Sequence, residues 1–169
     1  VARGGGLVAD VFDTKKRSEV MSRIRGKGNK TTELALAAAF RRAGIAGWRR
    51  HVVIKLPLGP RVAQREGKSH LIVRPDFVFR AERVAVFADG CFWHRCPLHC
   101  KMPANNRAFW EQKLSRNLER DRLVDRELRK AGWRVWRVWE HSLKGNDIPL
   151  HPRKSAPTLC PPSNPLSAR

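Results

Sequence analysis

Apolar residues recur at helical spacing in two short segments near the start of the chain. The first segment follows Asp13 or Thr14, either of which can cap a helix, and it is strongly basic. The second follows Thr31 or Thr32 and stops at Gly44. The apolar positions of the two predicted helices are Val20, Met21 and Ile24, and then Leu34, Leu36, Ala37 and Phe40.

A longer helix is predicted over about residues 105–131, with Gly132 ending it. Its apolar positions are Trp110, Leu114, Leu118, Val124 and Leu128. Four segments rich in β-branched and aromatic residues are predicted to be strands. They cover residues 48–55, 72–79, 83–88 and, after the long helix, 133–140, while residues 60–70 (PRVAQREGKSH) are interpreted as a polar loop. Counted from the second helix, the predicted order is α-β-β-β-α-β, an α/β fold.

The chain of 169 residues is predicted to form one domain over residues 13–145, because this length encloses a single core. Residues 1–12 lack periodicity and are expected to be a flexible arm. Residues 146–169 are rich in Pro and Ser and are expected to be a disordered tail.

The charge of the chain points to its partner. Lys and Arg number 35 against 15 Asp and Glu, which leaves a net charge of +20. This excess is of the sign that a polyanion attracts, so we expect a nucleic-acid partner. We find no apolar run long enough to span a bilayer and no signal-peptide pattern, so no membrane partner is expected and the protein is interpreted as cytoplasmic.

Cysteine and histidine cluster in the segment GCFWHRCPLHC. Cys91 and Cys96 are followed by His99 and Cys100, only one of which is expected to bind a metal, and His141 lies beyond the last strand. Two thiolates with imidazoles suit tetrahedral zinc, and a site closed by four protein ligands would be structural. The alternative is that these are buried structural cysteines without a metal.

Two carboxylates are candidate ligands of a catalytic cation. Asp76 stands in the otherwise apolar run RPDFVF, where an unpaired charge is costly unless it binds a cation or a base. Its alternative role is a salt bridge with the nearby Arg74. Asp89, at the end of the next strand, is a candidate second ligand, although a turn before Gly90 explains it equally well.

Two further residues are candidates for acid–base work. His94 follows the third strand and titrates in the range that a general base requires, although it is also a possible zinc ligand. Glu33, at the start of the second helix, is placed to reach the site through a water molecule. A Glu in a first helical turn also complements the helix dipole without further function.

Large aromatic side chains flank these candidates. Phe92 and Trp93 lie between a candidate zinc ligand and the candidate base, and Trp110 opens the long helix. Such side chains on a basic surface can wedge between base pairs, most readily where pairing is faulty. Core packing is the alternative role for all three.

Four segments together, RPDFVF, VFADGCFWHRCPLHC, FWEQKLSRNLERD and GWRVWRVWEHSL, resemble the very-short-patch DNA mismatch repair endonucleases in order and spacing. The resemblance runs from about residue 14 to residue 145. It implies a restriction-endonuclease-like fold with a structural zinc. It also implies magnesium-dependent nicking of duplex DNA on the T strand of T:G mismatches that arise from deaminated 5-methylcytosine.

Residue by residue, the resemblance makes Asp76 the magnesium ligand, His94 the general base and Glu33 a supporting acid. Asn117 matches a polar position near the mismatch or the DNA backbone. The aromatic residues that match intercalating positions are Phe92, Trp93 and Trp110.

For zinc, the resemblance implies the ligands Cys91, Cys96, His99 and His141, with Cys100 as the alternative to His99. Some members carry Thr-His where this chain has Ala88-Asp89, which puts a second metal ligand in doubt. The segment before RPDFVF also looks longer than usual.

Together these observations predict an endonuclease of mismatch repair that works in the bacterial cytoplasm at the nucleoid, with mismatch-repair proteins as further candidate partners. A zinc-containing DNA-binding module without catalysis is the main alternative, and Asp76 speaks against it because a lone carboxylate repels phosphate. A basic structural or ribosome-associated protein would explain the charge but not the GCFWH segment.

Overall fold

The computed structural model describes residues 32–144. The helix predicted after Asp13 or Thr14, the N-terminal arm and the Pro/Ser-rich tail lie outside the described residues. The elements are α2 (Glu33–Arg42), β1 (Trp48–Arg50), β2 (Ile54–Pro57), α3 (Pro60–Glu66), β3 (His70–Val73), β4 (Phe77–Phe79), β5 (Val84–Asp89), α4 (Arg107–Lys130), β6 (Arg134–Trp139) and the 3₁₀ helix η1 (Glu140–Lys144).

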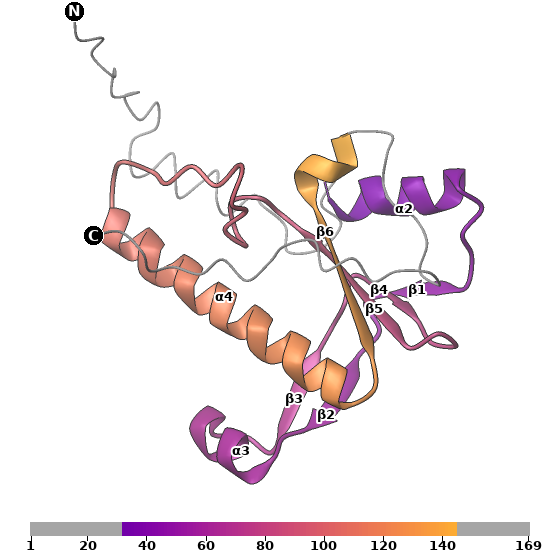
Figure 1. Cartoon of the computed structure of the whole chain (residues 1–169), viewed down its shortest axis with the longest axis horizontal. Helices are drawn as coiled ribbons and strands as arrows, with labels where there is room; N and C mark the ends of the chain where they lie inside the picture. The colour runs from indigo at the N-terminus through magenta and orange to yellow at the C-terminus, as the bar shows by residue number, and fades with distance from the viewer. Residues whose placement is uncertain (1–31, 145–169) are drawn as a thin grey trace, which may run out of the picture.

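A four-stranded mixed sheet in the order β1-β4-β5-β6 forms the centre of the molecule (Figure 1). β4 pairs antiparallel with both β1 and β5, whereas β5 and β6 run parallel. A parallel pair needs a crossover connection, and α4 provides it. The carboxyl ends of β5 and β6 therefore lie side by side, with Asp89 opposite Trp139.

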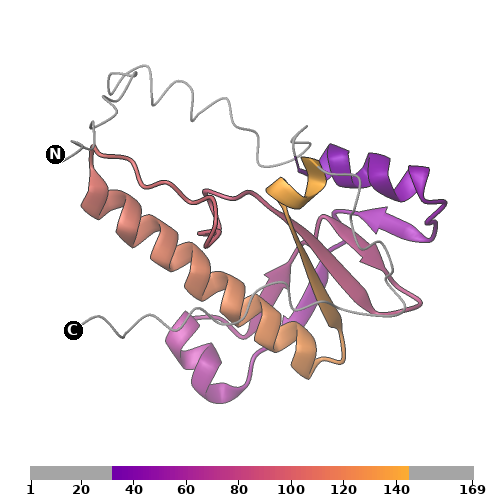
Figure 2. The same ribbon diagram turned by 45° about the horizontal axis from the view of Figure 1, so that its top comes forward.

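Successive residues of these strands pack on opposite faces of the sheet, as the period of two requires. One face carries Phe77, Val86 and Trp136, which pack against Phe40 of α2. The other face carries Val78, Ala85 and Val135, which share a core with Leu123, Val124 and Leu128 of α4. The sheet thus lies between α2 and α4 (Figure 2).

Two of the predicted strands, residues 48–55 and 72–79, are wrong as single elements. Residues 48–55 split into β1 and β2 because His51 takes a φ of 52°, in the left-handed region, which interrupts the extended chain. Residues 72–79 split into β3 and β4 around Pro75, which has no backbone N–H to give to a sheet.

β2 and β3 pair with each other as a separate antiparallel hairpin, with Leu56 opposite Leu71. The segment 60–70, predicted as a polar loop, contains α3, which was therefore missed. Pro60 starts this helix, and Gly67 ends it in the left-handed conformation. Without this hairpin, the order of the main fold is α2-β1-β4-β5-α4-β6, which agrees with the predicted α-β-β-β-α-β.

The helix predicted over about 105–131 and the strand predicted over 133–140 are confirmed as α4 and β6. α4 has 24 residues, so it spans about 36 Å. Gly132, with a φ of 77°, allows the chain to turn directly into β6. Among residues 32–144, no helix combines the length and the apolar character that crossing a membrane requires.

Candidate active site and metal centres

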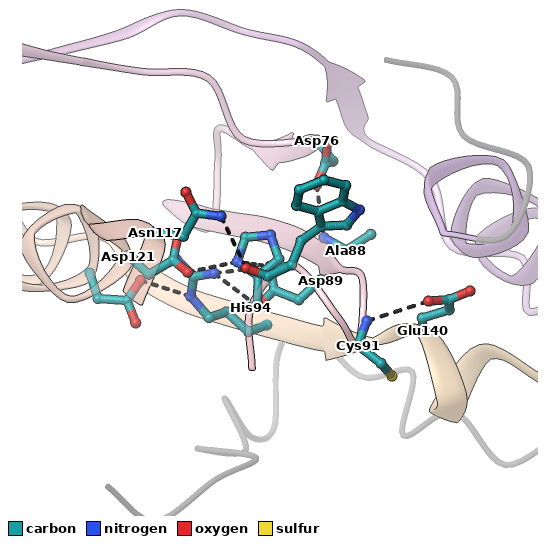
Figure 3. Close-up of polar contacts among 11 residues, drawn as sticks. Asp76, Ala88, Asp89, Cys91, His94, Asn117, Asp121 and Glu140 are labelled. Atoms are coloured by element: carbon teal, nitrogen blue, oxygen red, sulfur yellow. Dashed lines mark hydrogen bonds and ion pairs between the residues drawn. The ribbon is translucent and has the colours of Figure 1, made fainter. Parts of the chain in front are cut away.

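Asp76 lies just before β4, and its carboxylate is fixed by the neighbouring strand. Its Oδ2 accepts a hydrogen bond of 2.8 Å from the backbone N–H of Ala88, near the end of β5 (Figure 3). Burial and the nearby carboxylates of Glu33 and Asp89 raise the pKa of Asp76, although the Ala88 hydrogen bond acts in the opposite direction. A cation at this position would offset the cost of keeping the carboxylate ionised.

Glu33, His51 and Asp76 lie together, with one candidate ligand atom from each within 4.8 Å of the others. Glu33 is almost fully buried at the start of α2, where it pairs with Arg50 and, at 2.8 Å, with Nε2 of His51. The backbone N–H of His51 donates to the carbonyl of Asp76 at 3.3 Å. Sequence reasoning missed His51 because the predicted strand ran through it.

The imidazole of His94 is held from two sides in the loop after β5. Its Nδ1 is 2.6 Å from Oδ2 of Asp121 on α4 and 3.8 Å from Oδ1 of Asp89. Burial opposes the charged imidazole, but the hydrogen bond to Asp121 and the charges of Asp89 and Asp121 raise the pKa of His94 above its ordinary value. Asp121 was not singled out in the sequence, where it is one charged residue of a polar helix face.

Arg137 of β6 pairs with three carboxylates near His94. Its guanidinium contacts Asp89 at 2.9 and 2.8 Å, Asp121 at 3.1 Å and Asp125 at 3.0 Å. Burial opposes the charge of Arg137, but these three carboxylates raise its pKa. Asp89, considered above as a second metal ligand, is thus placed against Arg137, outside the group formed by Glu33, His51 and Asp76.

The second group of candidate ligands combines Cys91, Cys96, His99 and His141, whose ligand atoms all lie within 4.8 Å of one another. Sγ of Cys91 is 3.2 Å from Nδ1 of His141, and Sγ of Cys96 is 3.6 Å from Nδ1 of both His99 and His141. Burial and the neighbouring His99 lower the pKa of His141, which favours the neutral imidazole that binds metals.

Cys100 lies outside this group, with its thiol directed at the carbonyl of Phe92 over 3.7 Å. Two sulfur and two nitrogen donors are the donor set that tetrahedral zinc prefers, and both cysteines are buried whereas His99 is exposed, so the residues present fit this metal at the edge of the fold. Such a site would join the loop after β5 to η1, which are also linked by the hydrogen bond from the Cys91 N–H to Glu140 (Figure 3).

The three aromatic candidates form one cluster. The ring centroids of Phe92 and Trp93 lie 5.2 Å apart, and those of Phe92 and Trp110 lie 5.3 Å apart, both pairs edge to face. Trp110 is buried, whereas Phe92 and Trp93 are partly exposed. Asn117 donates to the carbonyl of Trp93 at 3.1 Å, so α4 fixes the backbone of this loop.

A cavity of about 250 Å³ opens beside His94. Asn117, Asp121 and Arg137 line it together with the histidine, and Arg74 and Arg120 bring positive charge to its rim. The candidate base thus faces a hollow whose lining includes Arg74, Arg120 and Arg137, and these positive charges suit a phosphate group.

Comparisons with known proteins show the family to which this chain belongs. Residues 50–101 match the family model described as DNA mismatch endonuclease Vsr. The type II nicking enzyme V.NaeI of Lentzea aerocolonigenes is 45% identical over 125 residues, which cover 74% of this chain and 68% of that relative. The type II nicking enzyme V.NmeAIP of Neisseria meningitidis serogroup A is 33% identical over 143 residues, 83% of this chain and 89% of the relative. The chain belongs to the Vsr family of DNA mismatch endonucleases.

The DNA mismatch endonuclease Vsr of Escherichia coli K12 is also similar, with 42% identity over 92 residues, 53% of this chain and 58% of that enzyme. Membership of the Vsr family makes this protein a DNA endonuclease, a hydrolase whose partner is DNA. The alternative of a DNA-binding module without catalysis thereby loses its support. The mixed α/β sandwich is consistent with the restriction-endonuclease-like fold that the resemblance implied.

Proposed function

We propose that this endonuclease nicks one strand of duplex DNA at T:G mismatches left by deamination of 5-methylcytosine, in a magnesium-dependent reaction. The observation that carries the proposal is the position of two groups at the same end of β5. Asp76 is bonded to the Ala88 amide, and His94 lies against the adjacent Asp89. A carboxylate that can bind a cation and an oriented histidine thus both lie at the carboxyl end of β5, which supports phosphodiester hydrolysis as the reaction.

Asp76, with Glu33 and His51 beside it, would hold the magnesium ion, whose preference for oxygen ligands the two carboxylates meet. When bound, the ion would polarise the phosphate and stabilise the charge that develops on it. His94 would take the proton of the attacking water. Asp121 keeps the ring of His94 oriented and stabilises its charged form once the proton has been accepted.

Zinc held by Cys91, Cys96, His99 and His141 is proposed to be structural, since four protein ligands leave no open position for a water. Its effect on catalysis would be indirect. The segment between Cys91 and Cys96 carries Phe92, Trp93 and His94, so a rigid Cys/His cluster would fix the wedge and the base together.

Phe92, Trp93 and Trp110 are proposed to insert beside the mismatch, where unstacking costs least. Their edge-to-face contacts keep two rings partly exposed on a rigid support. Asn117, expected near the mismatch or the backbone, is proposed to act by holding the carbonyl of Trp93. We further propose that the enzyme acts at the bacterial nucleoid alongside mismatch-repair proteins.

The deciding experiment is a nicking assay on a duplex with one T:G mismatch, with each strand labelled separately. We expect cutting of the T strand with magnesium, none with EDTA and little on the matched duplex. Cutting of both strands, or of matched DNA at the same rate, would contradict the mismatch proposal. Absence of any cut with magnesium would contradict the proposed T:G substrate.

A further inference from the structure

The β2–β3 hairpin with α3, residues 54–73, forms an arm beside the main sheet, next to the C-terminal half of α4 (Figures 1 and 2). We call it the hairpin arm. Leu56 and Leu71 of this arm share a core with Leu123 and Val124 of α4, so the arm is fixed to the helix. Between them lies a groove of about 950 Å³. The mechanism proposed above does not use this groove.

Positive charge dominates the groove from both sides. The hairpin arm contributes Arg65 and Lys68, and α4 contributes Arg116, Arg120, Arg122 and Arg126. Glu66, one of two acidic residues there, is already paired with Arg65 at 3.0 Å. Among the described residues 32–144, the side chains of Lys68, Arg116, Arg120 and Arg122 have no hydrogen-bond or ion-pair partner. Glu119 is the other acidic residue, so the groove has six cationic side chains against two carboxylates. This excess of exposed positive charge favours an extended anion.

The spacing of these charges suits a nucleic-acid backbone. Arg116 and Arg126 are ten residues apart on α4, a distance of about 15 Å along the helix axis. Over that length, one strand of B-form DNA presents about four phosphates, at roughly 3.4 Å of axis each. The arginines that α4 directs into the groove can therefore contact successive phosphates.

The groove adjoins the cavity beside His94. Ile72 and Arg120 line both of them, so the two hollows share a wall. A DNA strand with its reacting phosphate at His94 would pass Arg120 and enter the groove. Ile72, half of whose surface is exposed, offers an apolar contact to the sugars at this junction.

We propose that the groove between the hairpin arm and α4 binds the sugar–phosphate backbone of duplex DNA on one side of the cut. That DNA is the partner follows from family membership, and the placement relative to the cut rests on the function proposed above. Contacts of this kind position the protein without reading base sequence. The hairpin arm would thereby extend the DNA contacts to one flank of the target.

The test is a triple variant, Lys68→Gln with Arg116→Gln and Arg122→Gln. Arg120 is left unchanged because it also lines the cavity of His94. The matched control removes three exposed charges elsewhere, Arg42→Gln with Arg49→Gln and Arg80→Gln. Binding to matched duplex without magnesium is measured over a range of salt. We expect the slope of log affinity against log salt to become shallower by about one unit per lost phosphate contact in the triple variant only.

A second measurement locates the contact. Duplexes are shortened on one side or the other of a T:G mismatch. The parent and the control should lose affinity when one particular side is shortened, whereas the triple variant should be insensitive to that side.

An unchanged salt slope in the triple variant, or an equal change in the control, would overturn the groove proposal. The single variant Lys68→Gln, at an exposed position after α3, guards against a folding defect and should give about a third of the slope change. Because binding to matched DNA requires no cutting, the salt series can be interpreted even if the parent fails to nick T:G duplexes. That failure would count against the proposed function alone.

Discussion

Nδ1 of His94 and Oδ2 of Asp121 lie 2.6 Å apart, which joins the loop after β5 to the middle of α4. This contact orients the imidazole and leaves its other nitrogen available to a reactant. Arg137 contacts the other oxygen of the same carboxylate, Oδ1, at 3.1 Å and so holds Asp121 in place. The pair therefore has the arrangement of a base and its orienting group.

Asp121→Asn should lower single-turnover nicking by about 10²- to 10⁴-fold, the range attributed to a positioned base. DNA binding should change little, because the substitution keeps the shape of the side chain. Asp125→Asn is the matched control, since Asp125 lies on the same helix and contacts Arg137 but not His94. If both variants cut equally well, Asp121 does not position the base.

Asp121 should also link stability to pH. Burial alone would raise its pKa, but His94 and Arg137 outweigh burial and lower the pKa of Asp121 below its ordinary value. A lowered folded-state pKa gives stability that is present above the unfolded value of about 3.9 and is lost as the pH falls through the folded value. Parent and Asp121→Asn should therefore differ in free energy of unfolding near neutral pH and converge below about pH 4. Urea titrations across this pH range would measure the free energy of unfolding of both proteins. A difference between them that did not change with pH would contradict the link.

Asp76→Asn should separate chemistry from binding. The substitution keeps the size of the side chain but removes the charge proposed to hold the cation, so nicking should fall by orders of magnitude. Affinity for the T:G duplex should be kept or become stronger, because a carboxylate near phosphate is lost. Titration and single-turnover assays on the same preparation measure both quantities. Normal cutting by Asp76→Asn would show that another residue holds the catalytic cation.

The purified protein should contain about one zinc ion per chain. Cys91→Ser and Cys96→Ser should lower the metal content and the melting temperature, and activity should fall as a consequence. Cys100→Ser is the control and should keep both, because Cys100 lies outside the cluster. Full stability combined with lost cutting in Cys96→Ser would point to a catalytic metal at the cluster.

Phe92→Ala should weaken mismatch preference and leave the cation site intact. Base–aromatic stacking contributes about 1–3 kcal/mol, so discrimination between T:G and matched duplexes should fall by about 5- to 150-fold. Residual nicking should remain magnesium-dependent. Binding is compared at one fixed salt concentration, since phosphate contacts mask preference at low ionic strength. Discrimination equal to that of the parent would assign Phe92 to packing alone.

Local sequence patterns were sufficient to predict an element where apolar residues repeat over several helical turns. α4 was predicted to within two residues at each end because its apolar positions recur along 24 residues and Gly132 follows. The candidate ligands Cys91 and Cys96 were predicted to lie together for a similar reason, since thiols five residues apart on one loop cannot separate far. Local spacing could not decide whether His99 or Cys100 is the further candidate zinc ligand, because the two residues are adjacent. The resemblance favoured His99, and the turn of the loop places His99 in the cluster.

The strand boundaries and most of the residues around His94 could not be predicted, because they depend on contacts between distant parts of the chain. A β-branched run at residues 48–55 is compatible with one strand, and only the partner strands decide that β1 joins β4 and β2 joins β3. The sequence by itself determined the class of fold, the polyanionic partner and the candidate ligands, because composition and short-range spacing encode them. The tertiary structure decided that His51 joins Asp76, that Asp121 contacts His94 and that Arg137 holds Asp121. Charged residues far apart in sequence give no local signal of their pairing, since pairing arises only when β5, α4 and β6 pack together.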